Sequence, residues 1–121
     1  MTTETTDRES FAPLVFLVHD HAPGTYGLIL SDGMDATAAV FDEHGYEGGG
    51  YDWEAVARSA VQSRAPELAD RVAYDCEAGM FAAHGKDAEA LRRLGVLLHE
   101  AHRDPAVLAA HIAAADPDWF D

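Results

Sequence analysis

Histidine is the residue type in this sequence that most invites metal or acid–base chemistry. The chain carries seven histidines, and two pairs stand close together, His19 with His21 and His99 with His102. A zinc-protease helix places its two histidines four residues apart, whereas His99 and His102 are three apart. Such a pair can still bind a metal, but it needs further ligands that the sequence does not place. A small metal-dependent hydrolase using His19, His21, His99 and His102 is therefore one alternative; the other is that these histidines serve turns and a helix C-terminus.

The single cysteine, Cys76, is a poor candidate for a nucleophile. Its neighbours Asp75 and Glu77 would raise the pKa of the thiol and suppress the thiolate. The glycine run at residues 48–50 lacks the Lys and the Ser or Thr that complete a phosphate-binding loop. No serine stands in the sequence context of a nucleophile elbow. We therefore expect a protein that is not an enzyme and needs no cofactor.

The segment from Asp42 to Glu54 combines carboxylates, aromatic rings and three consecutive glycines. Such a loop can present Tyr and Trp beside carboxylates, which suits recognition of a basic partner. The alternative is purely structural: the glycines give backbone freedom, Asp52 caps a helix and Trp53 packs beneath it. The candidate partner-binding residues are Asp42, Glu43, Tyr46, Glu47, Tyr51, Asp52, Trp53 and Glu54, with Tyr46, Tyr51 and Trp53 as candidate anchors.

The C-terminal residues 116–121 repeat this combination of acidic and aromatic side chains. Two such patches can line one partner surface. Alternatively, Trp119 and Phe120 tuck the terminus onto the domain, since exposed paired aromatics are costly.

The charge balance is strongly acidic and excludes several classes of partner. Lys and Arg number 8 against 22 Asp and Glu, so the formal net charge is −14 with His neutral. Such a field repels nucleic acid and anionic membranes, but it attracts cationic proteins and speeds their association. A basic protein partner is the natural inference, and simple solubility is the alternative.

Compartment and domain count follow from length and composition. At 121 residues with 48% hydrophobic residues, the chain is long enough for one domain with a core of its own. A single cysteine permits no intramolecular disulfide and favours a reducing compartment. The first ten residues lack the basic start and apolar stretch of a signal peptide, and apolar runs such as Leu14 to Val18 are too short to span a bilayer. We expect a cytoplasmic protein with a mobile tail at 1–10 and a single domain at 11–121.

The pattern of apolar residues and turn signals predicts two hairpins. The run 14–18 is rich in strand-favouring residues and predicts a central strand. Turn signals at 21–24 lead into 25–30, which is typical of an antiparallel return strand. Residues 72–76 and 79–84 predict a second hairpin joined by Glu77 and Ala78.

Helical signals lie between and after the hairpins. Residues 36–44 are compatible with a helix that Gly45 stops in a left-handed conformation. Trp53, Val56, Ala57, Ala60 and Val61 recur at helical spacing after Asp52, which predicts a helix ending near Pro66. A third helix is capped by Asp87 and carries an apolar stripe of Leu91, Leu94, Leu98 and Ala101. A fourth helix starts at Asp104 and Pro105 and runs through Leu108 and Ile112.

These elements predict an α+β fold in which about four helices pack on a mostly antiparallel four-stranded sheet. An internal pseudo-repeat is compatible with the spacing of the turn residues. Asp20, Gly24, Tyr26 and Asp32 are each matched 55 residues later by Asp75, Gly79, Phe81 and Asp87, although turns favour Asp and Gly in any case. A regulatory domain that binds a small molecule between the two halves is a further alternative function.

Two motifs together resemble a known family. The run 44–54, with its glycine loop and Tyr-Asp-Trp, and the run 74–81, with Asp-x-Glu-Ala-Gly-Met-Phe, resemble the fifty-first family of bacterial immunity proteins from polymorphic toxin systems. The likeness extends from about Phe16 to Leu98. The sequence departs from the family pattern at Gly49, where a polar residue is usual, and at Cys76, where proline is common.

The resemblance implies a small cytoplasmic α+β protein that is made beside a toxin and blocks it by direct binding. It supplies no catalytic residues. We accordingly expect an immunity protein that neutralises its cognate toxin stoichiometrically through the acidic, aromatic segment 42–54. The partner is expected to be basic, such as a nuclease, because its Lys and Arg would pair with these carboxylates.

Overall fold

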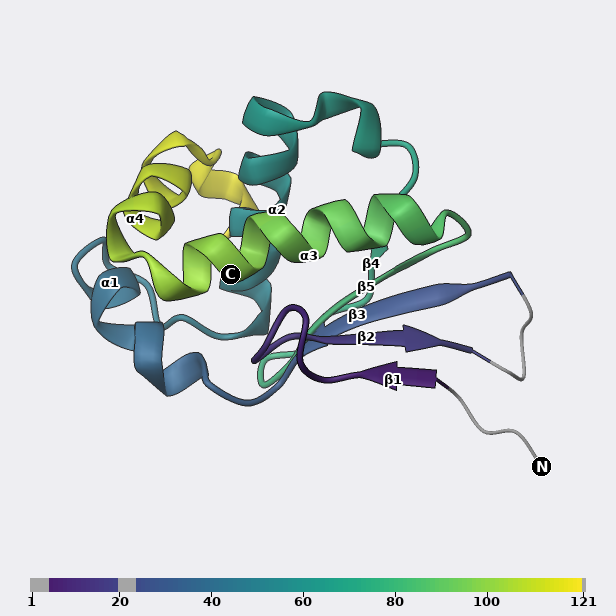
Figure 1. Ribbon diagram of the computed structural model, residues 1–121. Coiled ribbons are helices and arrows are strands. Elements are labelled where there is room, and N and C mark those ends of the chain that lie inside the picture. The colour runs from purple at the N-terminus through teal and green to yellow at the C-terminus, as the bar shows by residue number, and fades with distance from the viewer. Residues whose placement is uncertain (1–4, 20–23, 121) are drawn as a thin grey trace.

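A five-stranded antiparallel sheet forms one layer of the protein (Figure 1). In the computed structural model, which describes residues 5–19 and 24–120, its strand order is β1-β2-β3-β5-β4. The strands are β1 (Thr5–Asp7), β2 (Val15–Val18), β3 (Tyr26–Leu30), β4 (Ala73–Tyr74) and β5 (Phe81–Gly85). The α+β class is confirmed, but the prediction of four strands is wrong by one.

The additional strand, β1, lies within the segment that was expected to be a mobile tail. It pairs antiparallel with β2, with Asp7 opposite Phe16. This pairing satisfies the edge of β2, which would otherwise expose a row of unpaired backbone groups. The Asp7 carboxylate then accepts hydrogen bonds from the amides of Glu9 and Ser10, at 3.0 Å each, and so fixes the turn after the strand. Residues 1–4 of the expected tail lie outside the described residues.

The two predicted hairpins are present as β2-β3 and β4-β5, with their second strands side by side in the centre of the sheet. The turn residues 20–23 of the first hairpin lie outside the described residues. Tyr26 and Phe81, which the 55-residue spacing equates, each begin a central strand and lie at opposite ends of the β3-β5 pair. This arrangement is compatible with two similar units, and the pseudo-repeat itself stays a prediction.

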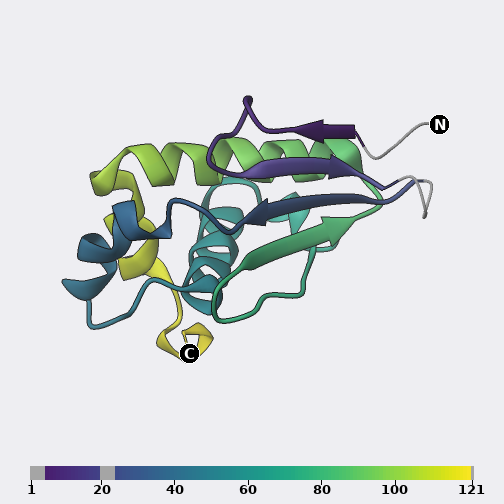
Figure 2. The same cartoon turned by 90° about the horizontal axis from the view of Figure 1, so that it is seen from below.

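Helices cover one face of the sheet (Figures 1 and 2). The long helix α3 packs on β2, β3 and β5, and α2 packs on β5. The helical elements are η1 (Met34–Thr37), α1 (Ala38–Asp42), α2 (Gly50–Arg64), η2 (Pro66–Leu68), α3 (Ala88–Arg103), α4 (Pro105–Ala114) and η3 (Pro117–Trp119). Within the described residues, none of these helices has the length and apolar character needed to cross a membrane.

The core lies between the sheet and the helices. Its largest fully buried side chains include Phe16, Leu28, Leu30 and Phe81 from the strands and Trp53 from α2. The apolar stripe predicted for α3 is confirmed, because Leu91, Leu94, Leu98 and Ala101 are all completely buried. Burial of each leucine contributes about 1.5–3 kcal/mol, so this stripe holds α3 against the sheet.

The helix ends test the capping predictions. Asp87 caps α3 by accepting from the Ala90 amide at 3.2 Å, and Asp104 caps α4 by accepting from the Ala106 amide at 3.0 Å. Gly45 has φ 87°, the left-handed conformation expected of it. The predicted cap at Asp52 is wrong, since α2 already begins at Gly50. The segment 36–44 is helical but begins as the 3-10 turn η1.

His111 lies where α2, α3 and α4 meet. The side chain is buried, and its Nε2 atom has no hydrogen-bond partner in the described part of the chain. Burial lowers the pKa of His111, nearby Arg64 of α2 lowers it further, and Glu100 of α3 raises it. Arg64 and Glu100 themselves lie 3.7 Å apart. The folded protein therefore favours neutral His111.

This burial predicts a pH-dependent contribution to stability. The folded-state pKa lies below the ordinary value of 6.5, so the contribution is complete above that value and is lost as the pH falls below it. Replacing His111 with Gln removes this titration. Urea denaturation gives the free energy of unfolding of wild type and of H111Q at each pH. We expect the difference, wild type minus H111Q, to decrease as the pH is lowered from 7.5 to 5.5. A constant or increasing difference would contradict a buried neutral His111.

Candidate functional site

The glycine loop between α1 and α2 is held by backbone hydrogen bonds. The Tyr46 amide donates to the Phe41 carbonyl at 3.0 Å, which closes the end of α1. The Gly48 amide donates to the Asp52 carboxylate at 2.7 Å. Asp52 thus reaches back from the first turn of α2, in the manner of the acidic residue of a capping box. Its negative charge at a helix N-terminus is also favourable.

Gly50 touches the turn between β4 and β5. Its amide donates to the Ala78 carbonyl at 2.9 Å. A Cβ atom at position 50 would overlap the backbone carbonyl oxygens of Glu77 and Met80, and one at Gly49 would crowd the Ala78 oxygen. The structure therefore joins the two motifs that the sequence singled out, because the glycine loop packs directly on the turn of the second hairpin.

Trp53 and Asp52 lie in the interior. Trp53 has no exposed surface; its ring meets that of Phe41 edge-on at 5.7 Å and stacks on His102 at 6.1 Å between centroids. Asp52 is 5% exposed and is engaged with Gly48. Trp53 cannot touch a partner in this conformation and Asp52 exposes very little surface, so the expectation of Trp53 as a surface anchor does not fit its burial. The structural alternative describes Trp53 correctly.

The other six candidate residues reach the surface to different extents. Asp42, Glu43 and Glu47 are exposed, and Tyr51 is 38% exposed. Tyr46 is half-buried. Glu54 is partly buried and binds Arg58 one turn later on α2 at 2.7 Å. The exposed and half-buried residues Asp42, Glu43, Tyr46, Glu47 and Tyr51 are called the loop surface below.

The C-terminal segment packs against the loop surface. The rings of Tyr46 and Phe120 are stacked, with centroids 3.8 Å apart and planes within 10°. The terminus is therefore tucked onto the domain, and Asp116 and Asp118 remain exposed in the same segment. Figure 2 shows the C-terminal end of the chain beside α2. The sequence identifies both segments as acidic and aromatic. It does not predict the stack between them, because Tyr46 and Phe120 are far apart along the chain.

Two shallow hollows flank Tyr46 and Glu47. One, of about 150 Å³, is also lined by Tyr51, Asp52 and Ala78. The other lies on the α1 side and is lined by Ala38, Ala39 and Asp42. Tyr46 and Glu47 therefore line both hollows, and a complementary protein surface can fit into such depressions.

Comparison with known families decides the class of this protein. A family model described as Immunity protein 51 matches residues 15–117. The chain belongs to the Immunity protein 51 family. Curated proteins and solved structures give no match. The Immunity protein 51 match covers both the glycine loop and the hairpin turn on which the loop packs, and it confirms the resemblance drawn from those motifs. Membership supports an immunity function and suggests a non-enzymatic role.

Two of the histidines that suggested a metal site, His99 and His102, contact backbone carbonyls in this member of the family. A ring nitrogen of His99 lies 2.9 Å from the Ala12 carbonyl oxygen, and one of His102 lies 2.8 Å from that of Gly33. These contacts tie α3 to the segments before β2 and after β3. Within residues 5–19 and 24–120, no group of three His, Cys, Asp or Glu side chains is placed to hold a metal ion. His21, part of the proposed hydrolase site, lies outside the described residues.

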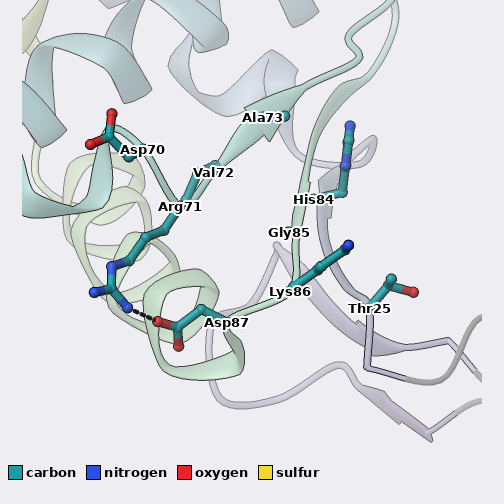
Figure 3. A pocket seen from close by; sticks show the side chains of 9 residues that line it. All are labelled: Thr25, Asp70, Arg71, Val72, Ala73, His84, Gly85, Lys86 and Asp87. Atoms are coloured by element: carbon teal, nitrogen blue, oxygen red, sulfur yellow. Dashed lines mark hydrogen bonds and ion pairs between the residues drawn. The ribbon is translucent and has the colours of Figure 1, made fainter.

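A hollow of about 500 Å³ lies where β4 and β5 meet the start of α3 (Figure 3). Arg71 is turned toward Asp87, with which it forms an ion pair, and this contact holds the pKa of the Asp87 carboxyl below its usual value. His84 and Lys86 extend away from that pair (Figure 3). A small-molecule site needs polar groups that converge on one point. This hollow therefore gives the small-molecule alternative no specific support.

Cys76 follows β4 and is half-buried. Its Sγ atom accepts a hydrogen bond from the Ala82 amide at 3.3 Å and lies 3.5 Å from the Ala82 carbonyl oxygen. Burial, with smaller contributions from Glu54 and Asp75, raises the pKa of the thiol to about 12. The predicted rise in the pKa of the Cys76 thiol is present, but burial outweighs the neighbouring charges as its cause.

The contact at Gly50 predicts a strong and local effect of a single methyl group. Gly50→Ala should lower the free energy of unfolding by about 1–3 kcal/mol or more, because overpacking forces the backbone to shift. Gly79→Ala is the matched control on the other side of the contact, since a Cβ there meets nothing within 4 Å. Urea denaturation of both variants checks this. Equal stability of the two would contradict the close packing of loop and turn.

The environment of Cys76 predicts slow thiol chemistry in the folded state. At pH 8 a thiol with a pKa of about 12 holds very little of the reactive thiolate. We expect Ellman's reagent to modify Cys76 at least tenfold more slowly in the native protein than in 8 M urea. Equal rates in the two conditions would show that the thiol is free and exposed.

Proposed function

We propose that this protein neutralises a cognate toxin by direct, stoichiometric binding through the loop surface. The observation that carries the proposal is a set of exposed carboxylates, Asp42, Glu43 and Glu47, around the half-buried ring of Tyr46 in a member of an immunity family. No ion pair to these three carboxylates occurs within the described residues. They are therefore available to pair with cations of a partner.

Charge around the loop surface favours a basic toxin. The sequence carries no Lys or Arg from residue 9 to residue 57. The carboxylates of the loop surface therefore have no basic side chain close to them along the chain. The whole chain has a formal net charge of −14, which attracts a cationic protein before contact. A nuclease is one such toxin, because it uses Lys and Arg to hold nucleic acid. Binding there would cover the toxin's own cationic groups.

Rigidity of the loop adds affinity. The Asp52 carboxylate fixes Gly48, the hairpin turn fixes Gly50, and Phe120 holds the ring of Tyr46. A surface that is already ordered loses less conformational entropy on binding. Tyr46 and Tyr51 then serve as anchors, since aromatic side chains dominate many interfaces. Trp53 supports this surface from below, and inhibition follows from occlusion rather than catalysis.

The proposed site of action is the cytoplasm. The single half-buried thiol suits a reducing compartment. A cytoplasmic inhibitor meets the toxin where a nuclease would find its substrate.

Charge reversal on the loop surface tests the proposal. In the variant D42K/E43K/E47K we expect the association rate constant for the toxin made beside this protein to fall about tenfold or more at low salt, since steering contributes on that order. Its dependence on ionic strength should also weaken. Stopped-flow measurements over a series of salt concentrations provide both quantities.

A control with the same change in net charge separates local contact from general attraction. Glu9, Asp32 and Glu89 are exposed and lie outside the loop surface. The variant E9K/D32K/E89K should therefore lose much less of the association rate. Identical kinetics of the two triple variants, or unchanged kinetics in D42K/E43K/E47K, would remove the loop surface from the interface.

A further inference from the structure

An apolar groove of about 460 Å³ lies between α2, η2, β4 and η3. The elements α2, η2 and β4 follow one another closely in sequence, whereas η3 is distant and is brought beside α2 by the packing of the C-terminal segment (Figure 2). Aliphatic and aromatic side chains dominate its lining, which includes Val61, Pro66, Val72, Tyr74 and Trp119. The half-buried rings of Tyr74 and Trp119 both line this groove, and aromatic side chains offer a large apolar surface to an apolar partner.

The cation at the groove is already neutralised. The Arg58 guanidinium lies 4.9 Å from the centre of the Tyr74 ring, and it binds the Glu54 carboxylate through two nitrogens, at 2.7 and 3.0 Å. The Arg58–Glu54 pair therefore forms a wall without net charge. Burial raises the pKa of Tyr74 to about 12, so the phenol adds no charge either.

The backbone of Tyr74 adds hydrogen-bonding groups along the groove. β4 is the edge strand of the sheet within the described residues. The Asp75 amide donates to the Ala82 carbonyl, and Ala73 lies opposite His84. Because paired backbone groups alternate along an antiparallel strand, the amide and carbonyl of Tyr74 point away from β5. An extended segment lying in the groove can use them.

Carboxylates adjoin the groove in sequence at three places. Asp70 follows the lining residue Ala69, Asp75 follows Tyr74, and Asp118 precedes Trp119. All three are exposed, and no ion pair to them occurs in the part of the chain that the structure describes. Exposed carboxylates therefore stand one residue away from three lining positions, while the lining itself is mostly apolar. This combination is complementary to an apolar side chain flanked by cations.

The groove is continuous with the loop surface. Trp119 lines the groove, and the next residue, Phe120, stacks on Tyr46. We propose that the groove receives an aromatic or long aliphatic side chain, flanked by Lys or Arg, from the same cognate toxin. This inference rests on the proposed function and adds to it a second contact, with the chemistry that contact selects.

Fluorescence of Trp119 reports occupancy of the groove directly. The probe is a hexapeptide with two lysines on each side of a leucine–phenylalanine pair, and the Trp119→Phe variant supplies the background from buried Trp53. We expect a saturable change in Trp119 emission that a peptide with glycines in place of the apolar pair does not produce. Equal responses to the two peptides would overturn the apolar part of the proposal.

Blocking the groove tests it with the toxin itself. Ala69 lines the groove and is exposed, so Ala69→Phe fills it without changing charge, and Ala110→Phe on the exposed face of α4 is the matched control. We expect A69F to weaken binding of the toxin at least tenfold and A110F to leave it unchanged, by isothermal titration calorimetry. Equal affinities of A69F and A110F overturn the groove contact while leaving the loop surface in place. Failure of the wild-type protein to bind the toxin overturns the proposed function instead.

Discussion

The close approach of α2 to the turn between β4 and β5 is the constraint on which the arrangement of this protein depends. Gly50 lies against the backbone of that turn and donates to the Ala78 carbonyl, and a side chain at position 50 has no room. Helix, hairpin and glycine loop can therefore meet at one point only because this residue is glycine. The hydrogen bond from the Gly48 amide to the Asp52 carboxylate then fixes the backbone of the glycine loop, and this backbone positions the loop surface.

Residues of the acidic, aromatic segment divide into a supporting and a presenting group. Trp53 and Asp52 are buried and hold the start of α2 in place, whereas Asp42 and Glu47 face solvent. Tyr46 joins the two groups, because its ring stacks on Phe120 and it also lines two hollows at the surface. This division explains why one segment can serve both as scaffold and as the proposed contact with a toxin. Folding and the proposed recognition therefore use different side chains of the segment 42–54.

Local interactions made much of the fold predictable. The stripe of Leu91 and Leu94 and the cap at Asp87 depend on neighbours within one or two turns, so their spacing alone indicates α3. β1 could not be foreseen, because residues 5–7 have no apolar alternation and form a strand only beside the edge of β2. The start of α2 was misplaced for a similar reason: Asp52 is a preferred cap, but contact with a distant turn fixes the helix at Gly50. The burial of Trp53 likewise depends on the rings of Phe41 and His102, which belong to other helices and give no signal near Trp53 in the sequence.

The central claim is that the loop surface and the adjoining C-terminal segment are where this immunity protein meets its toxin. Hydrogen–deuterium exchange of the protein with and without that toxin tests it most directly, because slowed exchange of amides locates a covered surface. The account predicts slower exchange at residues 42–51 and 116–120 in the complex, with no change around Val96 on the outer face of α3. Protection confined to α3, with residues 42–51 unaffected, would contradict it.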